Sequence, residues 1–180
     1  MKKIVVLTGS PRRNGNSSRL ADSFIKAAEG QGCEVQRFDT AFLKVAGCMA
    51  CNACFSKGCA CVVDDDFNKI AEAILEASAV IFVSPVYWYS FPAQLKAVID
   101  KLYSFCVVNK DTGSKKCALL TCCEERDLDT FTGIKFSYEK TVALMHWNSI
   151  GEVLIPGVFE EGEIQTTNGE ALAADLVNSL

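Results

Sequence analysis

Short apolar runs alternate along the chain with longer segments in which apolar residues recur every three or four positions. Runs of the first kind are typical of strands buried on both faces of a parallel sheet, and segments of the second kind are typical of amphipathic helices. Strands are predicted at 3–8, 33–39, 79–83, 117–121 and 152–155. Helices are predicted at about 17–29, from an N-cap at 64–66 to about 75, from Pro92 to about 102, at 136–146 and at about 173–180.

This strict alternation of five strands with five helices predicts an α/β fold. The strands are expected to form a doubly wound parallel sheet with helices on both faces, because each crossover between parallel strands needs a connecting element such as a helix. The chain has 180 residues, about the length of one domain, and shows no internal repeat or linker. We therefore expect a single domain over residues 1–180.

Composition restricts the classes of function. Hydrophobic residues make up 49% of the chain and charged residues 22%, which is typical of a soluble globular protein. The net charge of −4 argues against a nucleic-acid or anionic-membrane partner, since either calls for a basic surface. No stretch approaches the roughly 18 apolar residues of a membrane span, and the apolar run at 4–7 is too short for a signal peptide. We expect a cytoplasmic protein.

A small polar segment follows the first predicted strand and leads into the first helix. It reads Thr8-Gly-Ser-Pro-Arg-Arg-Asn-Gly-Asn-Ser-Ser18. Its hydroxyl and amide groups suit anionic oxygens, and the positive end of a helix dipole attracts an anion. The segment lacks both the G-x-G-x-x-G fingerprint of dinucleotide folds and the Gly-Lys-Ser/Thr ending of a P-loop. It therefore predicts a phosphate-binding loop of another kind, with an ordinary turn and a serine N-cap as the alternative.

An aromatic segment leaves the third predicted strand at its carboxyl end. It reads Ser84-Pro-Val-Tyr-Trp-Tyr-Ser-Phe-Pro92. Exposed aromatic area is costly unless it stacks on a flat ligand or meets a partner. In a doubly wound sheet this loop lies near the first one, at the point where ligands bind. The segment predicts one wall of a ligand site, and a buried aromatic cluster beneath the loop is the alternative.

Together with the following Pro92-Ala-Gln-Leu-Lys96, the two segments resemble the flavodoxin-like NAD(P)H-dependent FMN reductase family over residues 1–105. The resemblance implies a flavodoxin-like sheet with strand order 2-1-3-4-5 and non-covalent binding of FMN. The residues that it places on the FMN phosphate are Ser10, Arg12, Asn16, Ser17 and Ser18. Those that it places beside the isoalloxazine ring are Pro85, Val86, Tyr87 and Trp88. A third loop, Thr121-Cys-Cys-Glu124, is expected to border the flavin through Thr121, although it departs from the glycine-rich loop common in the family.

The same resemblance implies the chemistry. Flavin accepts hydride and releases electrons singly or in pairs, while the protein supplies position and electrostatics. NAD(P)H is the expected co-substrate, and a quinone, another small molecule or a redox protein is the expected acceptor. The single histidine, His146, falls on a predicted helix, and no residue is assigned a catalytic role. A homodimer is expected from the family.

Five of the ten cysteines fall within one loop, at 46–61, that shows no periodicity. Their pattern is Cys48-x2-Cys51-x2-Cys54-x4-Cys59-x-Cys61. Closely spaced thiols suit soft metals, and the spacing resembles the compact motif of iron–sulfur flavoproteins, a branch of the same group. A [4Fe–4S] cluster, a set of redox-active or unligated thiols, and structural zinc remain open for this loop. For a cluster, the expected ligands are Cys48, Cys51, Cys54 and Cys59, with Cys61 as the alternative to Cys59.

Different classes of function therefore remain. The first is FMN-dependent oxidation of NAD(P)H with transfer of electrons to an acceptor. The second is a non-enzymatic electron-transfer iron–sulfur flavoprotein or thiol redox sensor, in which the cysteine loop is the functional element. A zinc-stabilised interaction domain is the third. The other cysteines, which are expected to be small buried apolar residues, are Cys33, Cys106, Cys117, Cys122 and Cys123.

Overall fold

The apolar runs of the sequence form one parallel sheet. The computed structural model describes residues 1–180 and contains five strands in the order β2-β1-β3-β4-β5. The strands are β1 (Lys3–Thr8), β2 (Glu34–Asp39), β3 (Ala79–Pro85), β4 (Lys116–Cys122) and β5 (Asn148–Ile155). Every pairing between neighbouring strands is parallel. The predicted fold class and strand order are confirmed.

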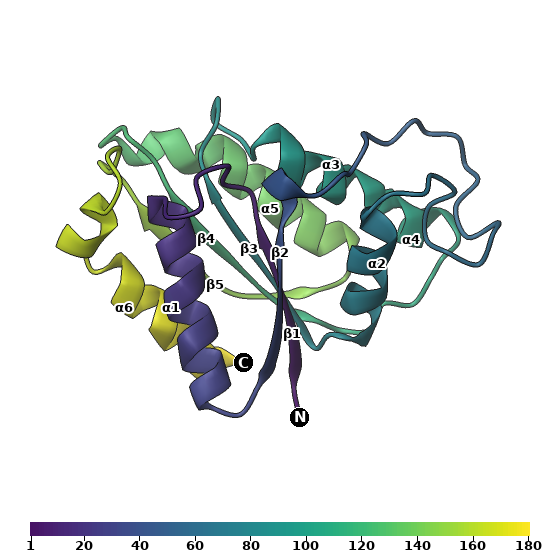
Figure 1. Cartoon of the computed structure of the whole chain (residues 1–180), viewed down its shortest axis with the longest axis horizontal. Coiled ribbons are helices and arrows are strands. Elements are labelled where there is room, and N and C mark those ends of the chain that lie inside the picture. Colours follow the sequence, from purple (N-terminus) through teal and green to yellow (C-terminus); the bar gives the residue numbers. More distant parts are fainter.

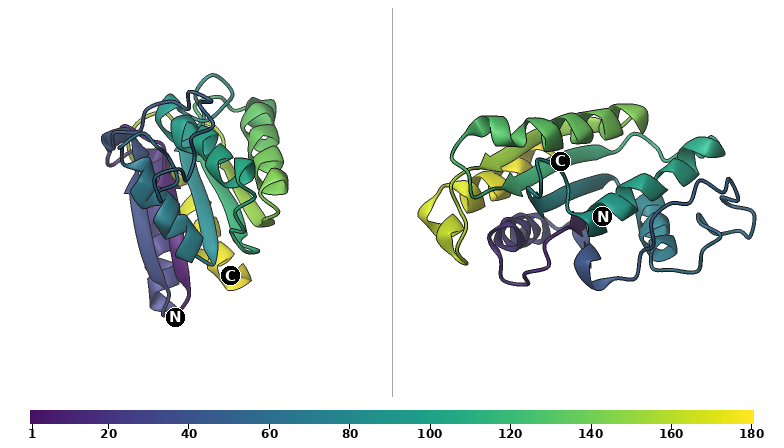
Figure 2. Two further views of the ribbon diagram at one scale, coloured as in Figure 1. Left: turned by 90° about the vertical axis from the view of Figure 1, so that its right-hand side faces the viewer. Right: turned by 90° about the horizontal axis from the view of Figure 1, so that it is seen from above.

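Helices connect successive strands and cover both faces of the sheet. They are α1 (Asn16–Gly30), α2 (Phe67–Glu76), α3 (Ala93–Lys101), α4 (Tyr103–Val107), α5 (Thr132–Leu144) and α6 (Gly169–Asp175). Helices α1 and α6 lie together on one face, and α2, α3 and α5 cover the other (Figure 1, Figure 2). None of the helices combines the length and hydrophobicity that a bilayer crossing requires.

Each face of the sheet has its own hydrophobic core. On one face, Phe24 of α1 packs in a cluster with Val6 and Ile81 of the sheet. On the other face, the Phe82 ring meets the Tyr138 ring of α5 edge-on, with the ring centroids 5.8 Å apart. Successive strand residues point to opposite faces, so strands covered on both faces need unbroken apolar runs. This is why the sequence places β1, β3 and β4 correctly.

Two predicted elements have shifted boundaries. Helix α5 begins at Thr132 instead of 136 and ends at Leu144, so His146 lies just beyond the helix and is exposed. Strand β5 begins at Asn148 instead of 152. Its first half is polar because it lies at the edge of the sheet, and its register with β4 shifts between Cys117 and Ala118. An edge strand of this kind lacks the apolar run on which the prediction depended.

Three helix starts also differ, and the last helix, α6, begins at Gly169 instead of about 173 and ends at Asp175 instead of 180. Pro92 is the residue before α3, and a short additional helix, α4, follows α3 after Leu102. Helix α2 starts at Phe67, so the carboxylates at 64–66 precede its first turn and Asp66 makes no side-chain cap. Of the cysteines expected in the core, Cys33 and Cys106 are only half-buried, whereas the other three are buried.

The strands end together at one edge of the sheet, the upper edge in Figure 1. The loop after β1, a hairpin after β3 and the segments after β4 and β5 all leave from this edge. In parallel α/β sheets, ligands bind outside the carboxyl ends of the strands, at the point where the strand order reverses. Here that point lies between β1 and β3.

Candidate flavin site and cysteine loop

The loop after β1, residues 9–15, crosses closely over β3. The Gly9 N–H donates to the Val83 carbonyl at 2.8 Å. A Cβ atom at Gly9 would lie 3.0 Å from the Ser84 Cβ and 3.1 Å from the Leu95 Cβ, which is tighter than ordinary packing. Glycine therefore allows the loop to turn directly above the neighbouring strand.

The Arg12 carbonyl organises the loop from inside. It accepts hydrogen bonds from the Ser10 hydroxyl, the Ser18 hydroxyl and the Gly15 N–H, each at 3.1 Å. The Arg12 N–H in turn donates to the Ser10 Oγ. Two of the hydroxyls predicted to hold a phosphate are thus committed to the shape of the loop, and Ser17 is the serine at this position whose hydroxyl forms no bond within the protein.

The N-terminus of α1 carries unsatisfied donors. Its N-cap is Gly15, which supplies no side-chain cap, and Asn16, Ser17 and Ser18 are buried. The backbone N–H groups of these three residues donate to no protein acceptor. Buried donors at the positive end of a fifteen-residue helix favour an anion. The alternative of a serine N-cap for this helix is wrong.

Asn16 has a second role that the sequence did not predict. Its side-chain N–H donates to the Glu160 carbonyl at 2.9 Å, and its Oδ1 accepts from the Gly162 and Ile164 N–H groups at 3.2 Å. The side chain therefore holds the segment 158–164, which follows β5. The predicted contact of Asn16 with a phosphate now depends mainly on its backbone N–H.

The aromatic segment after β3 forms a tight hairpin. Tyr87 and Ser90 exchange two backbone hydrogen bonds of 3.0 Å, and Trp88 and Tyr89 between them have φ values of +48° and +62°. Such turns usually carry Asn or Gly, because a side chain in the left-handed region costs about 1–2 kcal/mol per residue. The Trp88 side chain is 94% exposed, whereas Phe91 is buried against Phe82. A turn with a strained backbone at Trp88 and Tyr89 and a highly exposed Trp88 side chain indicates a functional role.

The hairpin rests on the start of α5. A Cβ atom at Gly133 would lie only 2.2 Å from the Tyr89 carbonyl oxygen, so no other residue fits there without movement. The helix can approach the hairpin backbone this closely only because position 133 has no side chain. A side chain at position 133 would therefore force α5 and the hairpin apart.

These loops enclose a cavity of about 340 Å³ at the carboxyl edge. Its lining residues are Ser10, Arg12, Gly15, Asn16, Ser17, Pro85, Val86, Tyr87, Trp88, Cys122, Cys123, Glu124, Val158 and Phe159. Of the residues predicted for the flavin, only Ser18 and Thr121 do not line it. Thr121 is fully buried and its hydroxyl has no hydrogen-bond partner; the next two residues, Cys122 and Cys123, line the cavity instead.

Sequence reasoning missed the wall formed by Val158 and Phe159. The Arg12 guanidinium donates to the Phe159 carbonyl at 3.3 Å and lies 5.6 Å from the centroid of the Phe159 ring. The sequence feature that could have predicted this wall is Pro156-Gly157, which ends the last strand and so marks another loop at the same edge.

Burial raises the pKa of Cys122 to about 12 and also raises the pKa of Cys123, so both thiols near this cavity stay protonated at neutral pH.

The cysteine loop lies beside α4 (Figure 1), and it contributes no residue to the cavity at the carboxyl edge. A small cavity of about 20 Å³ is lined by the thiol residues Cys48, Cys51, Cys54 and Cys61. Burial and, secondarily, the neighbouring thiols of the other three raise the pKa of Cys54. Cys59 does not line this cavity, and its Sγ contacts the Cys61 carbonyl at 3.1 Å. All ten cysteines are free, and no three His, Cys, Asp or Glu side chains converge closely enough to hold a metal ion.

A buried ion pair closes the base of the cysteine loop. Asp65 accepts from the Ala46 N–H at 3.0 Å and pairs with the Lys101 ammonium of α3, and the two side chains are only 7% and 2% exposed. The adjacent Asp66 accepts from the Lys44 N–H at 2.8 Å, and this bond is the main cause of its lowered pKa. Lys101 also lines the thiol cavity. Asp65 and Asp66, which the sequence predicted as part of a helix cap, therefore hold the base of the cysteine loop in place.

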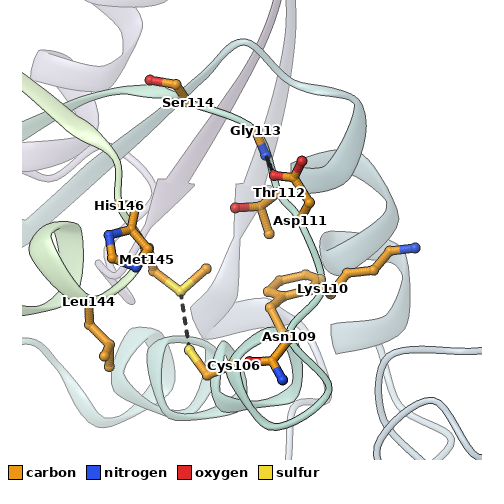
Figure 3. A pocket seen from close by; sticks show the side chains of 11 residues that line it. Cys106, Asn109, Lys110, Asp111, Thr112, Gly113, Ser114, Leu144, Met145 and His146 are labelled. Atoms are coloured by element: carbon orange, nitrogen blue, oxygen red, sulfur yellow. Dashed lines mark hydrogen bonds between the residues drawn. The ribbon is translucent and has the colours of Figure 1, made fainter.

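A larger cavity, with a volume of about 560 Å³, lies between α4, residues 109–114 and the end of α5. Figure 3 shows the side chains that line it. The Cys106 Sγ and Met145 Sδ atoms lie 3.8 Å apart in its wall. Residues 109–114 lead into β4 and residues 144–146 into β5, so this cavity lies at the amino edge of the sheet. No residue predicted for the site lines it. Its size alone does not outweigh the convergence of four loops at the carboxyl edge.

A doubly wound parallel sheet, a loop with free helix N–H groups after β1 and an aromatic hairpin after β3 define a flavodoxin-like protein. The model of the family described as NADPH-dependent FMN reductase matches residues 2–126, and the chain belongs to this family.

Known relatives agree with this assignment. An iron-sulfur flavoprotein of Archaeoglobus fulgidus is 37% identical over 103 residues, which are 57% of this chain and 46% of that protein. An iron-sulfur flavoprotein of Methanosarcina thermophila is 38% identical over 102 residues, which are 55% of this chain and 51% of that protein. The chain spans about half the length of the curated relatives it matches.

Solved structures share the fold at low identity. An azoreductase from Bacillus anthracis superimposes with a TM-score of 0.73 at 17% identity, with both chains covered completely. An NAD(P)H:quinone oxidoreductase from Methanothermobacter marburgensis also has a TM-score of 0.73 at 17% identity, with 97% of this chain and 94% of that chain covered. These likenesses support the flavodoxin-like fold.

Proposed function

We propose that the chain binds FMN in the cavity at the carboxyl edge and acts as an NADPH-dependent flavin oxidoreductase. The observation that carries the proposal is the meeting of buried, unsatisfied N–H groups at the start of α1 with an aromatic hairpin in one cavity. An anionic group at one end and a flat ring at the other are the two parts of a flavin mononucleotide.

The residues present fit this cofactor. The N–H groups of residues 16–18, the Ser17 hydroxyl and the Arg12 guanidinium would hold the phosphate. The hairpin and the loop at 122–124 would border the ring. When bound, a flavin supplies two-electron chemistry, since it takes a hydride from a nicotinamide and passes electrons on to an acceptor. The residues of this chain bind it, orient it and cover it.

A single phosphate site favours FMN over FAD. The loop offers the N-terminus of one helix, and the segment 158–164 closes over it through Asn16. A second phosphate would need a further set of donors, which dinucleotide folds supply through additional glycines. We expect heat-released cofactor to run as FMN in chromatography. Recovery of FAD would contradict this assignment.

A charge placed at the helix start tests the phosphate site directly. Ser17→Asp puts a carboxylate where the phosphate is expected, which also suits the helix dipole, so FMN affinity should fall while stability is kept. Ser23→Asp, farther along the same helix, adds the same charge away from the cavity and serves as the control. Both are measured by titrating apo protein with FMN. If the two variants bind FMN with equal affinity, the phosphate does not bind at the start of α1.

The thiols of the cysteine loop are the basis for proposing a second redox group. Four thiolates are the donor set of a [4Fe–4S] cluster, and the two relatives named iron-sulfur flavoprotein match 57% and 55% of this chain. We propose that the loop opens to admit a cluster, since the cavity of about 20 Å³ is smaller than one. The chain would then be an electron-transfer flavoprotein as well as a reductase.

The structure favours a different cysteine as the fourth ligand of the proposed cluster. Cys61 shares the cavity with Cys48, Cys51 and Cys54, whereas Cys59, which the spacing favoured, does not. We therefore propose Cys61 as the fourth ligand. Protein reconstituted without oxygen should lose most of its iron in Cys61→Ser and keep it in Cys59→Ser. The reverse result would restore Cys59, and wild-type iron near zero would leave a flavin reductase with free thiols.

A further inference from the structure

A second cavity adjoins the flavin cavity on the far side of the hairpin. Its volume is about 370 Å³, and its lining residues are Val86, Trp88, Tyr89, Cys123, Glu124, Glu125 and Thr130. Four of these, Val86, Trp88, Cys123 and Glu124, line both cavities. A molecule in the second cavity would therefore lie against the same four residues as a ring bound in the first. We call it the adjoining cavity.

The adjoining cavity carries two negative charges and no positive one. Glu124 and Glu125 are exposed, and no lysine or arginine lines the walls. The nearest arginine in the sequence, Arg126, lies with its side chain against Gly157. Uncompensated carboxylates around a small cavity attract cations and repel anions.

The walls also suit a flat molecule. Trp88 and Tyr89 present aromatic surface from the strained hairpin, and Val86 and Cys123 add apolar surface beside it. The Glu125 carboxylate accepts a hydrogen bond from the Thr130 hydroxyl, which fixes one charge at the rim. A cavity with flat apolar walls and a negative rim recognises planar molecules by stacking and by charge.

We propose that the adjoining cavity receives the electron acceptor, and that this acceptor is a planar molecule that is uncharged or, preferably, cationic. The inference rests on the proposed flavin oxidoreductase function. NADPH gives up a hydride, which carries two electrons and a proton, and an uncharged quinone takes a second proton from water to become the hydroquinone. A cationic dye takes the hydride equivalent and becomes neutral. Anionic acceptors meet repulsion from Glu124 and Glu125.

The test compares three acceptors in holoenzyme with NADPH as the reductant. Methylene blue is the cationic acceptor, menadione the uncharged one and dichlorophenolindophenol the anionic one. The variant is Glu125→Gln, which keeps an acceptor for the Thr130 hydroxyl and lies outside the flavin cavity. The matched control is Glu34→Gln, which removes the same charge at the start of β2, on the opposite edge of the sheet.

In Glu125→Gln, kcat/KM should fall about three- to tenfold for methylene blue and rise by a similar factor for dichlorophenolindophenol. Menadione, which carries no charge, should change less than either dye, and Glu34→Gln should change none of the three. Both shifts should vanish near 1 M salt, where the Debye length is about 3 Å. Opposite signs for opposite charges cannot come from a loosened fold, which would lower all three rates together.

A common change for all three acceptors, or no change for any, would overturn the inference. Bleaching of the bound flavin by NADPH without oxygen or acceptor tests the proposed function separately. If bleaching occurs and the charge dependence is absent, the acceptor assignment alone is wrong. If bleaching fails in the flavin-loaded wild type, the proposed function fails and the acceptor assignment falls with it.

Discussion

Gly133→Ala tests whether the start of α5 sets the position of the aromatic hairpin. The added Cβ would lie 2.2 Å from the Tyr89 carbonyl oxygen and 3.3 Å from its carbonyl carbon. Both atoms belong to the backbone, so no flexible side chain can move aside. Overpacking of this kind costs about 1–3 kcal/mol, and alanine returns at most about 1 kcal/mol through its higher helix propensity.

Two responses follow from this balance. If the hairpin keeps its place, the free energy of unfolding of the apo protein should fall by about 1–2 kcal/mol. If the hairpin moves, Tyr87 and Trp88 leave the wall of the flavin cavity and FMN affinity should fall instead. Urea unfolding of apo protein and titration with FMN separate the two responses.

Gly30→Ala is the matched control. Gly30 is the last residue of α1, and a Cβ atom there would meet nothing within 4 Å. This variant should be as stable as the wild type or slightly more so, with the same FMN affinity. If Gly133→Ala behaves like Gly30→Ala in both measurements, the contact between α5 and the hairpin does not position the site.

Three further predictions concern other parts of the molecule. Asn16→Ala removes three hydrogen bonds to the segment 158–164 and should lower the free energy of unfolding by about 1–3 kcal/mol. It should also speed protease cleavage within that segment. Cleavage at the wild-type rate would contradict the role of Asn16 as a clamp on the segment. Lys101→Met leaves the Asp65 carboxylate buried without its partner and should lower the free energy of unfolding, measured by heat or urea, by about 3–5 kcal/mol. Lys101→Arg should lower it by less. Equal decreases in both variants would mean that the shape of the lysine side chain stabilises the fold and its charge does not. Burial raises the pKa of Cys117 and Cys122 from 9.0 to about 12, so above pH 9 the folded state binds more protons than the unfolded state and stability falls as pH rises. Unfolding at pH 8 and pH 10.5 should show a smaller loss in a Cys117→Ala, Cys122→Ala double variant than in the wild type, and parallel losses would refute the assignment.

The sequence predicted the parts of the fold that short-range patterns encode. An apolar run specifies β1 to the residue, and the polar loop after β1 and the aromatic loop after β3 could be assigned to one site because parallel strands end at one edge. β5 was half missed because an edge strand needs no apolar run. The contact between Asn16 and Ile164 joins residues 148 apart, and no local pattern encodes such a contact.

The cysteine loop shows the same limit. Spacing alone favoured Cys59 over Cys61, but the fold of the loop is set by Asp65, Asp66 and Lys101, which fasten it from outside. The sequence could name the thiols but not which of them face one another. The single domain, the homodimer and the cytoplasmic location remain predictions.

The clamp between Asn16 and the segment 158–164 also orders events during synthesis. Ile164 follows Asn16 by 148 residues, so the ribosome releases the start of α1 well before the segment that covers it. Because synthesis proceeds at about 5–20 residues per second, the N–H groups at the start of α1 stay open to solvent for on the order of ten seconds before the segment covers them. Until β5 is in place, Phe159 cannot close the wall beside Arg12. A chain stalled before β5 would therefore present an anion-binding helix end without its cover, and retention of FMN should begin only after residues 158–164 have been synthesised.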